Sequence, residues 1–206
     1  MKSIIFSADM VQAILAGHKT QTRRVVSPQI KFFQGECFDV IQHYVNGKVK
    51  RFLTIASFIR EKAPHKIGDI LYVKETYCPS QTQESNYHYW TDGETIKIPS
   101  LSGGVDEIGR ADGLKWRPSI HMPREAARLF LRVTDVRVER LQDISLHDIC
   151  CEGILPNFLC KNEFINLWNG LNAKRDGGIY AWERNPWVWV YTFERCEKPG
   201  GSDDNG

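Results

Sequence analysis

The chain has 206 residues, a formal net charge of +2 and 42% hydrophobic residues, and aromatic residues make up 11% of it. This length fits one domain with insertions or two small domains, and the apolar content suffices for a packed core, which excludes global disorder. The small net charge excludes a protein that coats nucleic acid through its overall charge, so any such contact must come from a local patch. No apolar run approaches the roughly 18 residues of a membrane span.

The N-terminus and the cysteines indicate a cytoplasmic protein. Lys2 and a short apolar run fall far short of a signal peptide. The six cysteines form no C-x-x-C pair, and no histidine lies at zinc-finger spacing from them. We therefore expect reduced thiols, no metal and no cofactor.

The first elements are a strand at residues 4–6 and a helix after it. Ser7 suits the N-cap position, and apolar residues then recur at helical spacing. Gly17 suits the left-handed position that ends a helix. A further strand around Val25 ends at Ser27-Pro28.

Between this helix and this strand lies a basic stretch that contains Lys19, Arg23 and Arg24. No Asp or Glu occurs between Met10 and Gly35, so the sequence predicts a positive field with no local counter-charge. Such a cluster suits an anionic or polar ligand, although a solvated basic turn would have the same composition.

Lys19 and Thr22 lie three positions apart in this stretch. In a regular strand an odd spacing places two side chains on opposite faces. A site lined by both residues therefore requires the backbone to turn between them.

Two hairpins are expected in the segments that follow, one turning at residues 46–47 and one at residues 92–93, where Asn-Gly and Asp-Gly favour tight turns. Residues 70–77 read as a strand whose alternation puts Glu75 on the same face as Leu71 and Val73. If that face is interior, the carboxylate needs a partner or a raised pKa. The pattern alone favours a carboxylate in solvent at the end of the strand.

The segment 116–124 carries two prolines that hold it extended, and it lies within a second basic patch. It presents a tryptophan, a guanidinium, a hydroxyl and an imidazole. Taken singly, the tryptophan and the histidine are more often structural than functional. We expect this stiff segment to border the same cleft as the first basic stretch, with Arg117 or His121 facing it and Trp116 packing beneath or stacking a ligand.

The C-terminal third predicts alternating strands over residues 129–138 with a bend or bulge at 134–135. It also predicts a capping box at Ser145, an amphipathic helix over residues 164–171 and a strand over residues 187–193. Residues 197–206 read as a disordered tail. Short strands with few helices predict an α+β fold, a small mixed β-barrel decorated by helices.

Two motifs carry a resemblance to a known family. Gly17-x-Lys19-x-x-Thr22-x-Arg24 and Gly68-Asp69-x-Leu71-x-Val73-x-Glu75 resemble the ASCH domain, a relative of the RNA-binding PUA domain. The run 116–123 and the closing run 185–190 look like the longer ASCH proteins of phages and prophages. The resemblance covers residues 1–196 as a single domain, with insertions at about 29–66 and 79–112.

This resemblance implies a PUA-like barrel with a cleft beside the first helix. A small bacterial ASCH enzyme is an amidohydrolase that removes acetate from N4-acetylcytidine with a lysine, a threonine and a glutamate. These roles fall on Lys19 as base, Thr22 as nucleophile and Glu75 as the acid for the leaving group.

Three functions remain open. The first is hydrolysis of an N4-acylated cytidine. The second is RNA or DNA binding without catalysis, and the third is a metal-independent ribonuclease. The candidate binding residues, for a nucleoside or a nucleic acid, are Arg23, Arg24, Tyr77, Trp116, Arg117, Ser119 and His121.

Overall fold

The computed structural model describes residues 1–27, 31–33, 40–45, 48–79, 87–90, 96–99, 105–108 and 115–199. The two expected hairpin turns at 46–47 and 92–93, and most of the expected C-terminal tail, lie outside these residues. Within them, no helix has both the length and the apolar character needed to cross a membrane.

Five strands form one mixed sheet, hydrogen-bonded in the order β1-β6-β11-β12-β2. Their bounds are Lys2–Ile5, Ile70–Lys74, Phe130–Arg140, Trp187–Cys196 and Gln21–Val25 in that order. Together with the helices they confirm the α+β class. Strands β1 and β2 are the two ends of this order, and no pairing among the described strands closes the sheet into a barrel.

The chain divides into two compact units. The first unit contains Met1–Ala16, Ile70–Arg132 and Arg195–Gly206, and the second contains Gly17–Asp69 and Val133–Glu194. Strands β11 and β12 each contribute residues to both units.

The first unit is built on a parallel pair, β1 with β6, in which Ile4 lies opposite Val73. The start of β11 pairs antiparallel with β6. Helix α1 (Ala8–Leu15) follows β1, buries Val11 and Ile14, and ends at Gly17, whose φ of 79° confirms the expected left-handed position. Two short antiparallel pairs complete its strands: β7 (Tyr77–Pro79) with β8 (Tyr87–Tyr89), and β9 (Ile96–Pro99) with β10 (Val105–Ile108).

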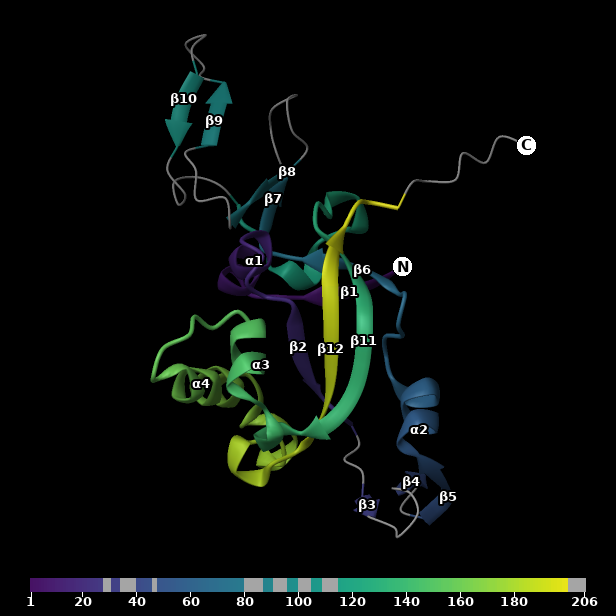
Figure 1. The fold of residues 1–206 in the computed structure, drawn as a ribbon. Coiled ribbons are helices and arrows are strands. Elements are labelled where there is room, and N and C mark those ends of the chain that lie inside the picture. The colour runs from purple at the N-terminus through teal and green to yellow at the C-terminus, as the bar shows by residue number, and fades with distance from the viewer. Residues whose placement is uncertain are drawn as a thin grey trace, which may run out of the picture. The chain divides into compact units, whose positions relative to one another are not determined.

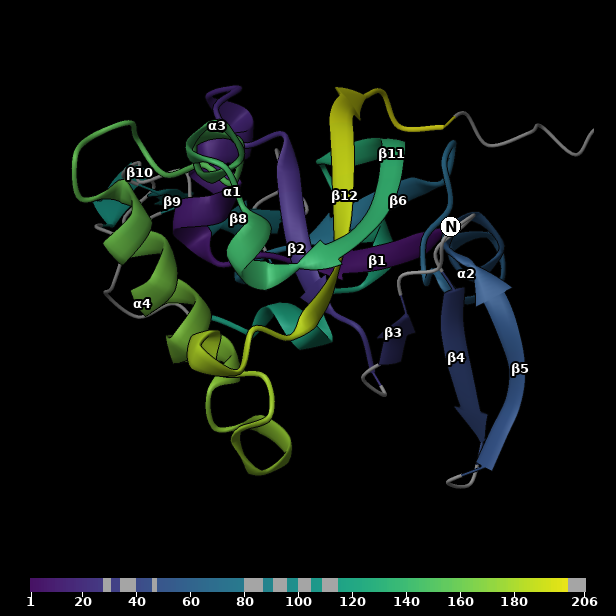
Figure 2. The same cartoon turned by 60° about the horizontal axis from the view of Figure 1, so that its bottom comes forward.

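The second unit contains β2 and most of β12, paired antiparallel so that Thr22 lies opposite Tyr191. Helices α3 (Leu146–Cys151) and α4 (Cys160–Asn172) lie to one side of these strands (Figures 1 and 2). Their buried side chains Ile149, Phe164 and Trp168 pack in one core with Val188 and Val190 of β12. Three short 3-10 helices complete this part of the unit: Leu141–Asp143, Arg175–Gly178 and Trp182–Arg184.

A second, smaller sheet also belongs to this unit. Its order is β3-β4-β5, with bounds Lys31–Phe33, Val40–Val45 and Lys48–Thr54. The β4–β5 pair confirms the hairpin expected around residues 46–47. Helix α2 (Ile55–Lys62) follows directly, capped by the Thr54 hydroxyl, which accepts from the backbone N–H of Ser57.

One expected strand pairing is wrong. Strand β8 pairs with β7 and β9 pairs with β10, so among the described residues the tyrosine strand at 87–89 is not paired with β9 as expected. Strand β11 spans Thr134 and Asp135, which are both exposed, and a bend or bulge at these residues stays a prediction. Alternation identifies strands but does not identify their partners.

The element expected over residues 70–77 is two strands, because β6 ends at Lys74 and β7 begins at Tyr77. The alternation of burial nevertheless continues across the break. Leu71, Val73, Glu75 and Tyr77 are all buried. The reading of Glu75 as a carboxylate in solvent is therefore wrong, and its face is interior.

Candidate functional site

Lys19 lies just before β2 and is 2% exposed. Its amine donates to Glu152 twice, to carboxylate Oε2 at 2.7 Å and to the backbone carbonyl at 2.8 Å. The backbones of the two residues also form a β-bridge, and the Thr20 N–H donates to the Cys151 carbonyl at 2.8 Å. The end of α3 is thus fastened to the chain that leads into β2.

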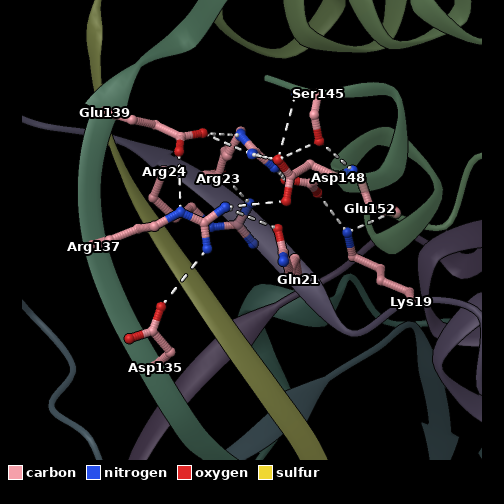
Figure 3. A network of polar contacts seen from close by, with 10 residues as sticks. All are labelled: Lys19, Gln21, Arg23, Arg24, Asp135, Arg137, Glu139, Ser145, Asp148 and Glu152. Atoms are coloured by element: carbon pink, nitrogen blue, oxygen red, sulfur yellow. Dashed lines mark hydrogen bonds and ion pairs between the residues drawn. The ribbon is translucent and has the colours of Figure 1, made fainter. Parts of the chain in front are cut away.

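Arg23 also binds Glu152 and contacts two further carboxylates. Its guanidinium donates to Glu152 Oε1 at 3.1 Å and to Glu139 Oε1 at 2.7 Å, and it lies 3.5 Å from Asp148 Oδ2 (Figure 3). The positive charges expected from the sequence are therefore compensated by carboxylates that are close in the folded structure. Lys19 and Arg23 are neutralised by carboxylates that lie more than a hundred positions away in the chain.

The network extends to α3 through its cap. The Ser145 hydroxyl accepts from the Asp148 N–H at 3.0 Å, which confirms the expected capping box. Arg137 of β11 donates to Asp148 Oδ1 at 3.1 Å and to Glu139 Oε2 at 3.0 Å. One buried set of charges therefore ties β2, β11 and α3 together within the second unit.

Two of these groups have shifted acidities with clear causes. Burial lowers the pKa of Lys19, as do the charges of Arg24 and Arg23, while the charge and hydrogen bond of Glu152 act against this. For Asp148, burial acts to raise the pKa, but the Ser145 hydrogen bonds and the charges of Arg23 and Arg137 outweigh it and lower the value.

Thr22 is 1% exposed. Side chains alternate along β2, so Thr22 and Arg24 occupy the face opposite to Arg23. Thr22 lies across from Tyr191, and Arg24 across from Trp189. The Lys19 amine is held on the Arg23 face, so a direct contact between Lys19 and Thr22 stays a prediction.

Aromatic side chains cover the Thr22 face. Phe58 of α2 stacks on Trp189 with ring centroids 5.2 Å apart, and the His65 ring meets Tyr191 edge-on at the same distance. The Tyr191 hydroxyl is buried, and no described group gives it a hydrogen bond of good geometry. Burial raises the pKa of Tyr191, although the nearby His65 backbone lowers it in part.

Glu75 belongs to the first unit and is 1% exposed. Its carboxylate accepts two hydrogen bonds from Arg128, at 2.9 Å from Nε and 3.0 Å from Nη2. The same guanidinium lies 3.9 Å above the ring of Tyr89. The expected need of an interior carboxylate for a partner is thereby met by Arg128. A site that Glu75 shares with Lys19 and Thr22 stays a prediction.

The segment 116–123 lies against Glu75 and Tyr77 within the first unit. The Tyr77 hydroxyl donates to the His121 carbonyl at 3.1 Å, and the backbones of Tyr77 and Arg117 form a bridge. The sulfur of buried Met122 lies 3.2 Å from the Glu75 backbone nitrogen. Arg117 and His121 are exposed at their side chains.

Trp116 is half-buried and packs edge-on against Trp90, with ring centroids 5.1 Å apart. Ser119 opens a short 3-10 helix, Ser119–His121, and a second one, Arg124–Ala126, follows. A proline precedes each of these 3-10 helices and holds the backbone extended at that point, as the sequence predicts.

The partners of the motif residues were not predicted from the sequence. Glu152, Glu139, Asp148 and Arg137 hold the first basic stretch, and Arg128 holds Glu75. Only Asp148 carried a local signal, as part of the capping box. Among the described residues, no group of three or more His, Cys, Asp or Glu side chains is arranged to hold a metal ion.

Comparison with known proteins finds no matching family model and no matching curated protein. Among solved structures, the chain is similar to the crystal structure of protein EF3133 from Enterococcus faecalis V583, of the family DUF984. The sequence identity is 11% and the TM-score 0.44, and the alignment covers 98% of this chain and 85% of the other.

Proposed function

We propose that this is an ASCH-type, PUA-like protein that acts on modified nucleosides or nucleic acid, and that it hydrolyses the amide of an N4-acylated cytidine. The observation that supports hydrolysis most is the state of Lys19. A lysine can serve as a general base only when its pKa falls towards neutrality, and burial lowers the pKa of Lys19. The mixed sheet with flanking helices is compatible with the PUA-like part of the proposal.

In the proposed reaction the Thr22 hydroxyl attacks the acyl carbonyl carbon while Lys19 accepts the hydroxyl proton. The C–N bond then breaks, and the resemblance assigns to Glu75 the proton that N4 of the departing cytidine takes up. Water hydrolyses the acyl-threonine ester and releases the carboxylic acid, which restores the hydroxyl. N4 gains one proton from Glu75, which the proton that Lys19 took from Thr22 replaces, and water gives its hydroxide to the acyl carbon and its other proton to the Thr22 oxygen.

Two contacts must change during such a reaction. The Lys19 amine donates to Glu152 and must reach towards the other face of β2 to meet the Thr22 hydroxyl. Glu75 accepts two hydrogen bonds from Arg128 and must take up a proton before it can deliver one. The flexible four-carbon stem of lysine allows the first change.

The test is an assay of the purified protein with N4-acetylcytidine, in which cytidine is quantified by chromatography. Lys19→Ala, Thr22→Ala and Glu75→Gln should each remove most turnover, and the double variants should lose little more, because groups that act as one unit are not additive. Thr22→Ser keeps a hydroxyl and should retain measurable activity. Lys174→Ala, which removes an exposed lysine, is the matched control.

Tight binding of acylated nucleosides by the wild type without turnover of any of them would contradict hydrolysis. Equal turnover by the wild type and Thr22→Ala would exclude the threonine nucleophile.

A binding module for RNA is the second candidate, and the surface of the segment 116–124 favours it. Arg117, His121 and Arg124 are exposed there, beside half-buried Trp116. Guanidinium groups that contact phosphates and an aromatic ring that stacks a base are the usual elements of single-strand recognition. Cleavage of a labelled RNA in the presence of EDTA would instead support the ribonuclease reading.

A further inference from the structure

The Glu152 carboxylate lies between two cations. Oε2 accepts from the Lys19 amine at 2.7 Å, and Oε1 accepts from Arg23 Nη1 at 3.1 Å. The side chains of both cations are at most 1% exposed, and that of Glu152 is 6% exposed. Charge pairs shielded from water in this way interact more strongly than surface pairs.

The other charges that act on Lys19 have the opposite effect. Arg23 and Arg24 on β2 both disfavour a proton on the amine, as burial does, and Glu152 at the end of α3 is the group that favours it. The remaining carboxylates of the network, Glu139 and Asp148, hydrogen-bond to arginines. Among the described residues, Glu152 is therefore the carboxylate that favours the proton on Lys19.

The hydrogen-bond geometry suits both protonation states of the amine. An ammonium has three N–H donors, and a neutral amine keeps two N–H groups and gains a lone pair. Two donors already go to Glu152, one to its carboxylate and one to its backbone carbonyl. A neutral Lys19 can keep at least one of these contacts while its lone pair accepts a proton from elsewhere.

We infer that Glu152 is a positioning residue of this site, which fixes the Lys19 amine and determines when it holds its proton. The inference rests on the proposed function in one respect, namely that Lys19 acts as the base. Glu152 touches Lys19 and acts through it. Nothing in the ASCH-like motifs includes this residue.

The first test measures Lys19 directly, without any substrate. The full-length protein is labelled with 13C-lysine, and the Lys19 side-chain signal is identified by its loss in Lys19→Ala. In the wild type it should titrate at lower pH than the exposed lysines. In Glu152→Gln it should titrate at still lower pH, because the favourable charge is gone while burial, Arg23 and Arg24 remain. Glu163→Gln removes an exposed carboxylate of α4 and should leave the titration unchanged.

The second test uses the pH dependence of kcat/KM for N4-acetylcytidine. A base must be unprotonated, so the rate rises with pH through the pKa of Lys19. Glu152→Gln should shift this rise to lower pH. Glu152→Ala, which also removes the hydrogen bond, should lower the plateau by roughly tenfold to a hundredfold through misplacement of the amine. Glu152→Asp keeps the charge and should restore the wild-type position of the rise in part. Circular dichroism confirms that each variant is folded.

An unchanged Lys19 titration in folded Glu152→Gln would overturn the inference, whether or not the protein hydrolyses the nucleoside. A lower Lys19 titration without turnover by the wild type would support the role of Glu152 and contradict the hydrolase. A reduced plateau with no shift of the rise would overturn proton control and reduce Glu152 to a structural contact.

Discussion

Glu75 and Arg128 form a two-pronged ion pair in which each carboxylate oxygen accepts one guanidinium N–H, at 2.9 and 3.0 Å. The glutamate is buried, whereas the arginine side chain is 29% exposed and is covered on one side by the Tyr89 ring. The pair therefore holds a carboxylate in the interior while its cation keeps contact with solvent. This geometry is specific for arginine, because only a planar fork makes both contacts at once.

Glu75→Gln should destabilise the protein by about 1–3 kcal/mol, because the amide cannot accept both guanidinium hydrogen bonds. Arg128→Lys should cost a similar amount, since a point charge replaces the fork. Urea unfolding of both single variants and the double variant gives the coupling between them. Additive losses would show that the pair contributes no interaction energy.

Asp148→Asn should lower the free energy of unfolding at pH 7 by about 1–2 kcal/mol, because Arg23 and Arg137 lose a charged acceptor. The pKa of Asp148 is lowered in the folded state, so its stabilisation is complete above the unfolded pKa and is lost as pH falls through the folded pKa. Wild type and variant should therefore differ fully above about pH 5, begin to converge near pH 4 and meet only below the lowered pKa of folded Asp148. Asp143→Asn, at an exposed position, is the control, and the measurement is urea unfolding from pH 3 to 7. A difference that stays constant over this range would contradict the charge argument.

Tyr191→Phe should be neutral or stabilising, within about 1 kcal/mol, because it removes a buried hydroxyl that lacks a well-formed hydrogen bond. Tyr180→Phe is the matched comparison. Its hydroxyl, also on a buried tyrosine, donates to Ser27 Oγ at 3.2 Å, and the loss should cost about 0.5–1.5 kcal/mol. Thermal unfolding of both variants decides the order. A larger loss in Tyr191→Phe would reveal a partner of that hydroxyl in solution.

Arg117→Ala should weaken binding of a single-stranded RNA and reduce the slope of log affinity against log salt by about 0.7, the value for one phosphate contact. The backbone of Arg117 is held by Tyr77 through an N–H···O bond of 2.8 Å, so removal of the exposed side chain should leave the segment in place. Fluorescence anisotropy over a salt series measures the slope. Arg184→Ala, another exposed arginine, should leave it unchanged.

Features with short-range causes could be predicted from the sequence. The α3 cap depends on two side chains three positions apart, and the end of α1 depends on Gly17. The final strand β12 was also predictable, because a run of seven alternating β-branched and aromatic residues strongly favours a strand. The burial of Glu75 was not predicted, because its alternation with Leu71 and Val73 shows that the three residues share a face but does not show whether that face is interior.

Features that depend on distant residues could not be predicted. Lys19 and Glu152 are 133 positions apart, and no periodicity links them. The sequence therefore indicated an uncompensated cation where the structure has a neutralised one. The predicted pairing of the strand at residues 87–89 was wrong for the same reason. Alternation marks a strand, but which strand it pairs with depends on the topology of the whole sheet.

The pairing of β2 with β12 has a consequence for synthesis of the chain. Thr22 leaves the ribosome long before its cross-strand neighbour Tyr191 is synthesised. Until then β2 cannot pair with β12. Lys19 and Arg23 likewise cannot form their hydrogen bonds to Glu152 until that residue has been synthesised. Contacts this far apart slow folding and expose nascent strands to aggregation. A chain that stops before β12 would therefore depend on chaperones, even with Lys19, Thr22 and Glu75 in place.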